Sequence, residues 1–271
     1  MRKEIKDVII ATGVRDVFFL VPETANSVTI VLYRQKVERF SRELTAEDGL
    51  DLVLKERTME KIKNEIRELD IKDSVIIKVL ELQMHDCPDI LLREIEEGIR
   101  RMSSVADCVL LGYGLCGIAI PEMERVIREA PVPVVIARDK EGTILNNCIE
   151  IALGRETVQS LLDEEIGTFF MTPAGAAIIK EPHIIFESTI NINIMDRVRQ
   201  MKRHTDIALD TAQILKLMKN HYNRVVKIWY SDADKRNEEY TQTVNKFAKR
   251  FNLEIKPVKG STEIICETLK G

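Results

Sequence analysis

Three cysteines stand at similar intervals between residues 87 and 148 of the chain. Cys87, Cys116 and Cys148 are separated by 29 and 32 residues, and His85 lies two positions before the first of them. Thiolates and imidazole are ligands of zinc and of iron–sulfur clusters. If the fold brings these side chains together, a zinc ion or an iron–sulfur cluster held by them is the chemistry that we expect. The alternatives are that one cysteine acts as a nucleophile, or that all three pack as small apolar side chains.

The segments around the cysteines predict parallel strands connected by helices. Apolar runs at 75–80, 109–111 and 132–137 are typical of buried strands, and amphipathic helices are predicted over 88–102 and 121–129. One strand–helix–strand unit takes about 30 residues, which matches the interval between the cysteines. We therefore expect the three thiols at the carboxyl ends of neighbouring parallel strands, on one rim of one sheet.

The middle cysteine lies in a glycine-rich turn, Leu111-Gly112-Tyr113-Gly114-Leu115-Cys116-Gly117. Glycine adopts backbone angles that side chains forbid, so the three glycines predict a tight turn that presents Cys116. We expect these glycines and Tyr113 to contact a bound cofactor. The loose Gly-x-Gly-x-x-Gly pattern, with Asp139 22 residues after its last glycine, keeps a dinucleotide or another phosphorylated ligand as an alternative. Cys108, before its strand, and Cys266, in the last helix, are interpreted as structural.

The whole chain is predicted to have an α/β fold, with parallel, Rossmann-like sheets and helices on both faces. We expect three parts: a mixed, mostly helical segment over 1–70, a first α/β lobe with the cysteine rim over 71–165, and a second α/β lobe over 166–271. Further strands are predicted at 8–11, 17–20, 167–173, 225–230 and 253–258. Further helices are predicted at 22–44, 46–69, 145–153, 156–165, 191–220, 238–251 and 261–269.

Composition narrows the class of protein. The 271 residues carry a net charge of −4, with 40 Lys and Arg interleaved among 44 Asp and Glu, so a nucleic-acid partner is not expected. The sequence has no apolar run of membrane-spanning length and no secretory signal at its start, and an odd number of cysteines, five, does not suggest a disulfide framework. We expect a cytoplasmic protein without a membrane partner. Self-association and enzymatic activity are left open.

The glycine turn and two later stretches resemble a domain-of-unknown-function family found in methanogens, acetogens and related anaerobes. The later stretches are Leu153-Gly154 and Gly167-Thr168-Phe169-Phe170-Met171-Thr172-Pro173, and further matches extend to Lys259-Gly260-Ser261. The resemblance covers roughly residues 75–271. Where the family commonly has His-Asp-Cys, this chain has Asn146-Asn147-Cys148, and Cys87 is a candidate to replace the lost ligand.

Members of that family tend to lie beside corrinoid-dependent methyltransferase systems. The resemblance therefore implies a context in anaerobic one-carbon metabolism. Together with the spacing of the cysteines, it leads us to expect a metal- or iron–sulfur-binding protein associated with corrinoid-dependent methyl transfer or with cofactor maturation. A methyltransferase or a corrinoid protein is the partner it implies, and a corrinoid would be reached through that partner. The alternatives are a non-catalytic partner of such a protein and a cysteine-dependent enzyme acting on a small molecule.

Overall fold

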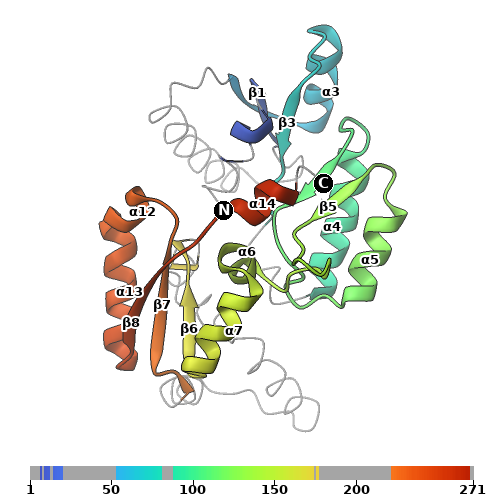
Figure 1. Cartoon of the computed structure of the whole chain (residues 1–271). Helices are drawn as coiled ribbons and strands as arrows, with labels where there is room; N and C mark the ends of the chain where they lie inside the picture. The colour runs from blue at the N-terminus through green and yellow to red at the C-terminus, as the bar shows by residue number, and fades with distance from the viewer. Residues whose placement is uncertain are drawn as a thin grey trace, which may run out of the picture.

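The described part of the chain folds into three parallel sheets, each accompanied by helices (Figure 1). This computed structural model describes residues 7, 9–12, 15–20, 53–80, 88–173, 175–176 and 221–268. Every pair of neighbouring strands within these residues runs in parallel. The predicted α/β class with parallel sheets is therefore confirmed.

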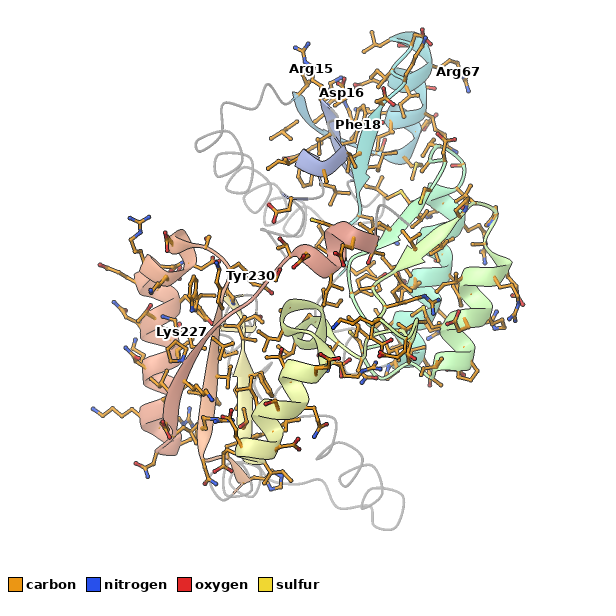
Figure 2. All side chains as sticks on the ribbon, viewed as in Figure 1. Arg15, Asp16, Phe18, Arg67, Lys227 and Tyr230 are labelled. Atoms are coloured by element: carbon orange, nitrogen blue, oxygen red, sulfur yellow. The ribbon has the colours of Figure 1, made fainter. Side chains whose placement is uncertain are left out.

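The first sheet has β1 (Asp16–Leu20) at its centre, between β2 (Val53–Arg57) and β3 (Ser74–Ile77). Helix α3 (Met59–Glu68) connects β2 to β3 and packs in one apolar cluster with Phe18 of β1. Figure 2 shows Phe18 among the side chains of this sheet. A buried apolar side chain on the central strand thus holds this cluster together, and the cluster also includes Met102 from later in the chain.

The structure corrects the prediction from the sequence at two places in this N-terminal part. Residues 9–12 are helical rather than extended, since a short apolar run fits a buried helical turn as well as a strand. Residues 53–57, predicted to belong to a helix over 46–69, form a strand, because parallel pairing with β1 gives their backbone groups partners. The predicted helices over 22–44 and 191–220 lie outside the described residues.

The second sheet consists of β4 (Val109–Leu111) and β5 (Val134–Ile136). Helix α4 (Pro88–Met102) precedes β4, and α5 (Ile120–Glu129) connects the two strands. Both helices bury their apolar sides with the strands in one shared core. These four elements agree closely with the predicted ranges, and Pro88 begins α4, where proline's missing amide hydrogen costs nothing.

Strand β3 belongs to the first sheet and not to the sheet of β4 and β5. Its register runs along β1, with Ser74 opposite Asp16 and Ile77 opposite Phe19. The expectation that three neighbouring strands carry three thiols on one rim is therefore wrong for the strand before Cys87. A β-branched run predicts that a strand exists, but contacts between distant segments decide which strand it pairs with.

The third sheet has the order β6 (Thr168–Met171), β7 (Arg224–Trp229) and β8 (Glu254–Lys259). Helices α12 (Asp232–Arg236) and α13 (Glu238–Phe251) connect β7 to β8. In Figure 1 the long α13 lies along the outer face of this sheet. The strands agree with their predicted positions to within a few residues.

Side chains of β7 alternate between two layers of helices. Val225 joins the apolar cluster of α13, whereas Val226 and Ile228 pack in a cluster with α6 (Cys148–Leu153) and α7 (Arg155–Glu164). Successive side chains of a strand point to opposite faces of the sheet. Helices therefore cover both faces of the third sheet, as the sequence predicts.

The C-terminal helix α14 (Glu263–Thr268) returns from the third sheet toward the second. Its Ile265 is buried in a cluster with Ala137, Leu145 and Ile151, which belong to the segment from β5 to α6. The division of the chain at residues 70 and 165 stays a prediction. No helix within the described ranges combines the length and the apolar character that crossing a membrane requires.

Candidate functional site

Two backbone hydrogen bonds join the turn after β4 to the loop before α6. The amide of Leu115 donates to the carbonyl of Leu145 at 2.9 Å, and the amide of Cys116 donates to the carbonyl of Asn146 at 2.7 Å. Cys148, two residues after Asn146, is the first residue of α6. Because β4 and β5 are parallel neighbours, both cysteines follow strands at the same end of this sheet. The structure thus brings two of the three predicted cysteines to one end of the same sheet.

Gly114 is buried where the two loops come closest. A Cβ atom there would collide with the Leu145 carbonyl oxygen and would lie 2.6 Å from the Asn147 nitrogen and 2.8 Å from the Asn146 carbonyl carbon. All three are backbone atoms, so no side-chain rotation can make room for a methyl group. Gly112, in contrast, has open space around it. Of these two positions, only position 114 requires glycine, because the two loops leave no room there for a Cβ atom.

Cys116 has a backbone conformation that is unusual for a residue with a side chain. Its φ of 49° lies in the left-handed region, which residues other than glycine rarely adopt and which recurs at functional sites. Leu115 and Ile118, on either side, are buried in the core of the second sheet. Gly117, with φ of 90°, lies against the ring of Pro88, whose Cγ would be 3.0 Å from an added Cβ. The packing around the turn therefore holds Cys116 in this conformation.

The side chains of Tyr113, Cys116 and Cys148 lie close enough to influence one another's ionisation, and we call this group the two-cysteine site. Burial raises the pKa of Cys116 to about 12, the neighbouring Cys148 adds to the rise, and a hydrogen bond with the Gly114 backbone opposes it. Burial also raises the pKa of Tyr113, and Cys116 contributes to that rise. Cys148 is exposed whereas Cys116 is half-buried. The site thus has one accessible thiol and one shielded thiol.

Alkylation of the metal-free protein should distinguish the two thiols. We expect iodoacetamide to modify Cys148 at neutral pH well before Cys116, because only the thiolate reacts and a thiol with a pKa of about 12 is almost fully protonated there. Between about pH 7 and pH 10 the Cys116 rate should rise roughly tenfold per pH unit, as its thiolate fraction does. Peptide mass spectrometry over time gives both rates. Equal rates at pH 7 would contradict the shielding of Cys116.

A buried carboxylate supports the loop that contacts Cys116. Glu150, which is 7% exposed, accepts hydrogen bonds from the backbone nitrogen of Asn146 at 2.7 Å and from its side-chain nitrogen at 2.8 Å. Arg155 lies 3.5 Å from the same carboxylate and donates to the Ile144 carbonyl at 2.9 Å. The Asn147 side chain caps α6. Sequence reasoning missed Glu150 and Arg155, and the only signal for Glu150 was its position four residues after Asn146.

The carboxylate of Asp139 is engaged within its own turn. It accepts hydrogen bonds from the backbone nitrogens of Glu141 at 3.1 Å and Thr143 at 2.8 Å, and it pairs with Arg155. These contacts give Asp139 a structural part in the turn before α6. They add no support to the interpretation of Asp139 as the acidic residue of a dinucleotide site.

The remaining predicted ligands are not in the described part of the structure. His85 and Cys87 lie outside the described residues, so their participation stays a prediction. Cys108 precedes β4, at the opposite end from Cys116, and Cys266 packs against the apolar cluster under α14. None of the four described cysteines forms a disulfide. Among the described residues no group of three or more His, Cys, Asp and Glu side chains is placed to hold a metal ion.

Comparison with known proteins agrees with the resemblance found in the sequence. Neither the curated proteins nor the solved structures contain a match to this chain. A family model matches residues 79–269, which include the two-cysteine site and the third sheet but not β1 to β3. The chain therefore belongs to the family described as Protein of unknown function (DUF1638).

Proposed function

We propose that Cys116 and Cys148 bind a soft metal centre, either a zinc ion or an iron–sulfur cluster. The observation that carries this proposal is the hydrogen bond from the Cys116 amide to the Asn146 carbonyl, which holds the two cysteine-bearing loops together. Thiolates are preferred ligands of both kinds of centre. The chemistry of the two side chains therefore fits such a group.

The two described thiols make up part of a complete ligand set. Structural zinc sites and cubane clusters usually take four protein ligands. Our predictions for the others are Cys87 and His85. Pro88, the first described residue after them in the sequence, lies against Gly117 in the turn that holds Cys116. Because Pro88 directly follows Cys87 in the sequence, this contact supports testing Cys87 and His85 as the missing ligands.

The ionisation of Cys116 favours a metal ligand over a free nucleophile. A nucleophilic cysteine needs a lowered pKa, and the pKa of Cys116 is raised to about 12. A bound cation replaces the thiol proton and so produces the thiolate at neutral pH. The left-handed backbone of Cys116 and the packing around it would fix the direction of its sulfur before metal binds.

We further propose that the centre serves anaerobic one-carbon metabolism, beside corrinoid-dependent methyl transfer or in cofactor maturation, with a methyltransferase or corrinoid protein as partner in the cytoplasm. The support is the resemblance carried by the glycine turn, together with the thiol chemistry of the site. A zinc centre would activate a thiol acceptor as a Lewis acid, whereas an iron–sulfur cluster would supply electron transfer. The protein's own part is to hold both thiols at one end of the second sheet.

Metal analysis after anaerobic purification tests the proposal. We expect stoichiometric metal in the unmodified protein, and loss of most of it in Cys116→Ser and in Cys148→Ser, because each variant removes one thiolate ligand. Cys108→Ser, at the opposite end of β4, should retain the metal and is the matched control. A colourless protein containing zinc identifies one centre, and a brown protein containing iron and sulfide identifies the other. Protein without stoichiometric metal, or full retention in both variants, would overturn the proposal.

A further inference from the structure

A second cluster of chemically active side chains surrounds Trp229, at the carboxyl end of the third sheet. Trp229 is the last residue of β7 and stands opposite Lys259, the last residue of β8. The ammonium nitrogen of Lys259 lies 5.7 Å from the centre of the Trp229 ring, and that of Lys235, in α12, lies 5.1 Å from it. Two cations from different elements therefore gather over one half-buried aromatic ring.

The charge of these two lysines is not balanced by an ion pair within the described residues. Lys256, on the opposite face of β8, differs because it pairs with Glu164. One carboxylate oxygen of Asp234 in α12, Oδ2, accepts from the backbone amides of Tyr230 at 3.0 Å and Ser231 at 3.1 Å. A cation over an aromatic face gains only about 0.5–1 kcal/mol at an exposed site. Lys235 and Lys259 thus retain capacity for an anion.

Lys227, one pleat before Trp229 on the same face of β7, adds a third cation. Its ammonium nitrogen lies 5.2 Å from the centre of the Tyr240 ring and donates to the Thr241 hydroxyl at 2.8 Å, and burial lowers its pKa. Figure 2 labels Lys227 within β7 and Tyr230 just beyond its end. The described residues show no ion pair for Lys227 either, so positive charge continues along this face.

The chain around the cluster has a closely packed conformation. The amide of Gly260 donates to the Trp229 carbonyl at 2.8 Å, so the segment after β8 is tied to the end of β7. A Cβ atom at Gly260 would lie 3.0 Å from Ile228 and 3.1 Å from the ring of Tyr230. Open parallel sheets bind ligands at the carboxyl ends of their strands. The lysines therefore lie where this kind of sheet places its ligands.

The geometry points to a binding site for a phosphate-bearing small molecule, held by Lys235 and Lys259 beside the ring of Trp229. Lysine ammonium groups are compact charges that commonly bind phosphate, and the aromatic ring provides an apolar surface for the part of the ligand next to it. The site lies on the third sheet, whereas the two-cysteine site lies on the loops of the second sheet. It does not depend on the proposed metal centre.

The fluorescence of Trp229 tests this site directly, because it is the chain's only tryptophan. Sodium pyrophosphate is added to the full-length protein at constant ionic strength maintained with sodium chloride, and orthophosphate and ATP are titrated separately. We expect a saturable change in emission with half-saturation below about 1 mM. Lys235→Gln and Lys259→Gln should each weaken binding about tenfold or more, since each removes one charge-assisted hydrogen bond. Tightest binding of ATP indicates a nucleotide, and equal binding of pyrophosphate and ATP indicates recognition of phosphate alone.

Two further variants separate this site from general ionic effects and from the metal centre. Lys256→Gln removes a lysine from the other face of β8 and should bind pyrophosphate as the unmodified protein does. Cys116→Ser should also bind it normally, so loss of the metal centre would leave this result intact. Isothermal titration calorimetry provides a measurement that does not depend on tryptophan emission. Three outcomes would overturn the inference. The change in tryptophan emission could increase linearly with pyrophosphate concentration, or sodium chloride could reproduce it. Alternatively, Lys256→Gln could weaken pyrophosphate binding as much as Lys259→Gln does.

Discussion

Gly114→Ala is expected to destabilise the protein severely and to abolish metal binding at Cys116 and Cys148. The added methyl group would collide with the Leu145 carbonyl oxygen and would lie 2.6 Å from the Asn147 nitrogen. The turn after β4 and the loop before α6 must then move apart, which breaks the backbone hydrogen bonds between them. Overpacking against a backbone that cannot adjust costs about 3 kcal/mol, which corresponds to a fall in Tm of roughly 5–10 °C. Thermal unfolding and metal content measure the two effects.

Gly112→Ala is the matched control, because it adds the same methyl group to the same turn. Nothing lies within 4 Å of a Cβ atom at Gly112, and its φ is not positive. We expect its Tm within about 2 °C of the unmodified protein, as is usual for surface substitutions, and unchanged metal content. A Gly114→Ala protein that melts like Gly112→Ala and retains its metal would show that the two loops are not held as closely as the structure indicates.

The pairing of Cys116 with Cys148 could be predicted from the sequence because it depends on a regular unit. A strand, a glycine turn and a helix follow one another twice, and parallel strands place the residues after them on one edge. The same regularity failed for the strand before Cys87. Its apolar run predicts a strand correctly, but pairing with β1 depends on a segment some 60 residues earlier, and no local pattern shows such a partner.

The difference between Gly112 and Gly114 could not be predicted either. Both are glycines in the same short turn, and their distinct importance comes from a loop about 30 residues later that packs against only one of them. Glu150 was missed for a related reason. Its position in a helical stretch is typical of a solvated acidic residue, and only the folded loop shows that it is buried against Asn146.

Glu150→Ala is expected to loosen the loop before α6 and to expose the thiol of Cys116. The carboxylate is surrounded by donors, since it accepts from the Asn146 backbone and side-chain nitrogens and lies beside Arg155. Hydrogen bonds to a charged group are worth about 1.5–3 kcal/mol each, so we expect a loss of about 2–3 kcal/mol in the free energy of unfolding. Because the Asn146 carbonyl accepts from the Cys116 amide, loosening this loop should also speed the alkylation of Cys116 in the folded protein.

Two variants calibrate this effect. The free energy of unfolding and the Cys116 labelling rate of Glu150→Gln should lie between those of the unmodified protein and of Glu150→Ala. A flipped Asn146 amide can restore both hydrogen bonds to Asn146, but the negative charge facing Arg155 is lost. Glu156→Ala removes an exposed carboxylate whose ion-pair partner, Lys140, is equally exposed, and should leave unfolding and Cys116 labelling unchanged. Urea denaturation gives the free energies, and labelling under native conditions gives the access to Cys116. If Glu150→Ala behaves like Glu156→Ala in both measurements, the buried carboxylate does not hold the two-cysteine site.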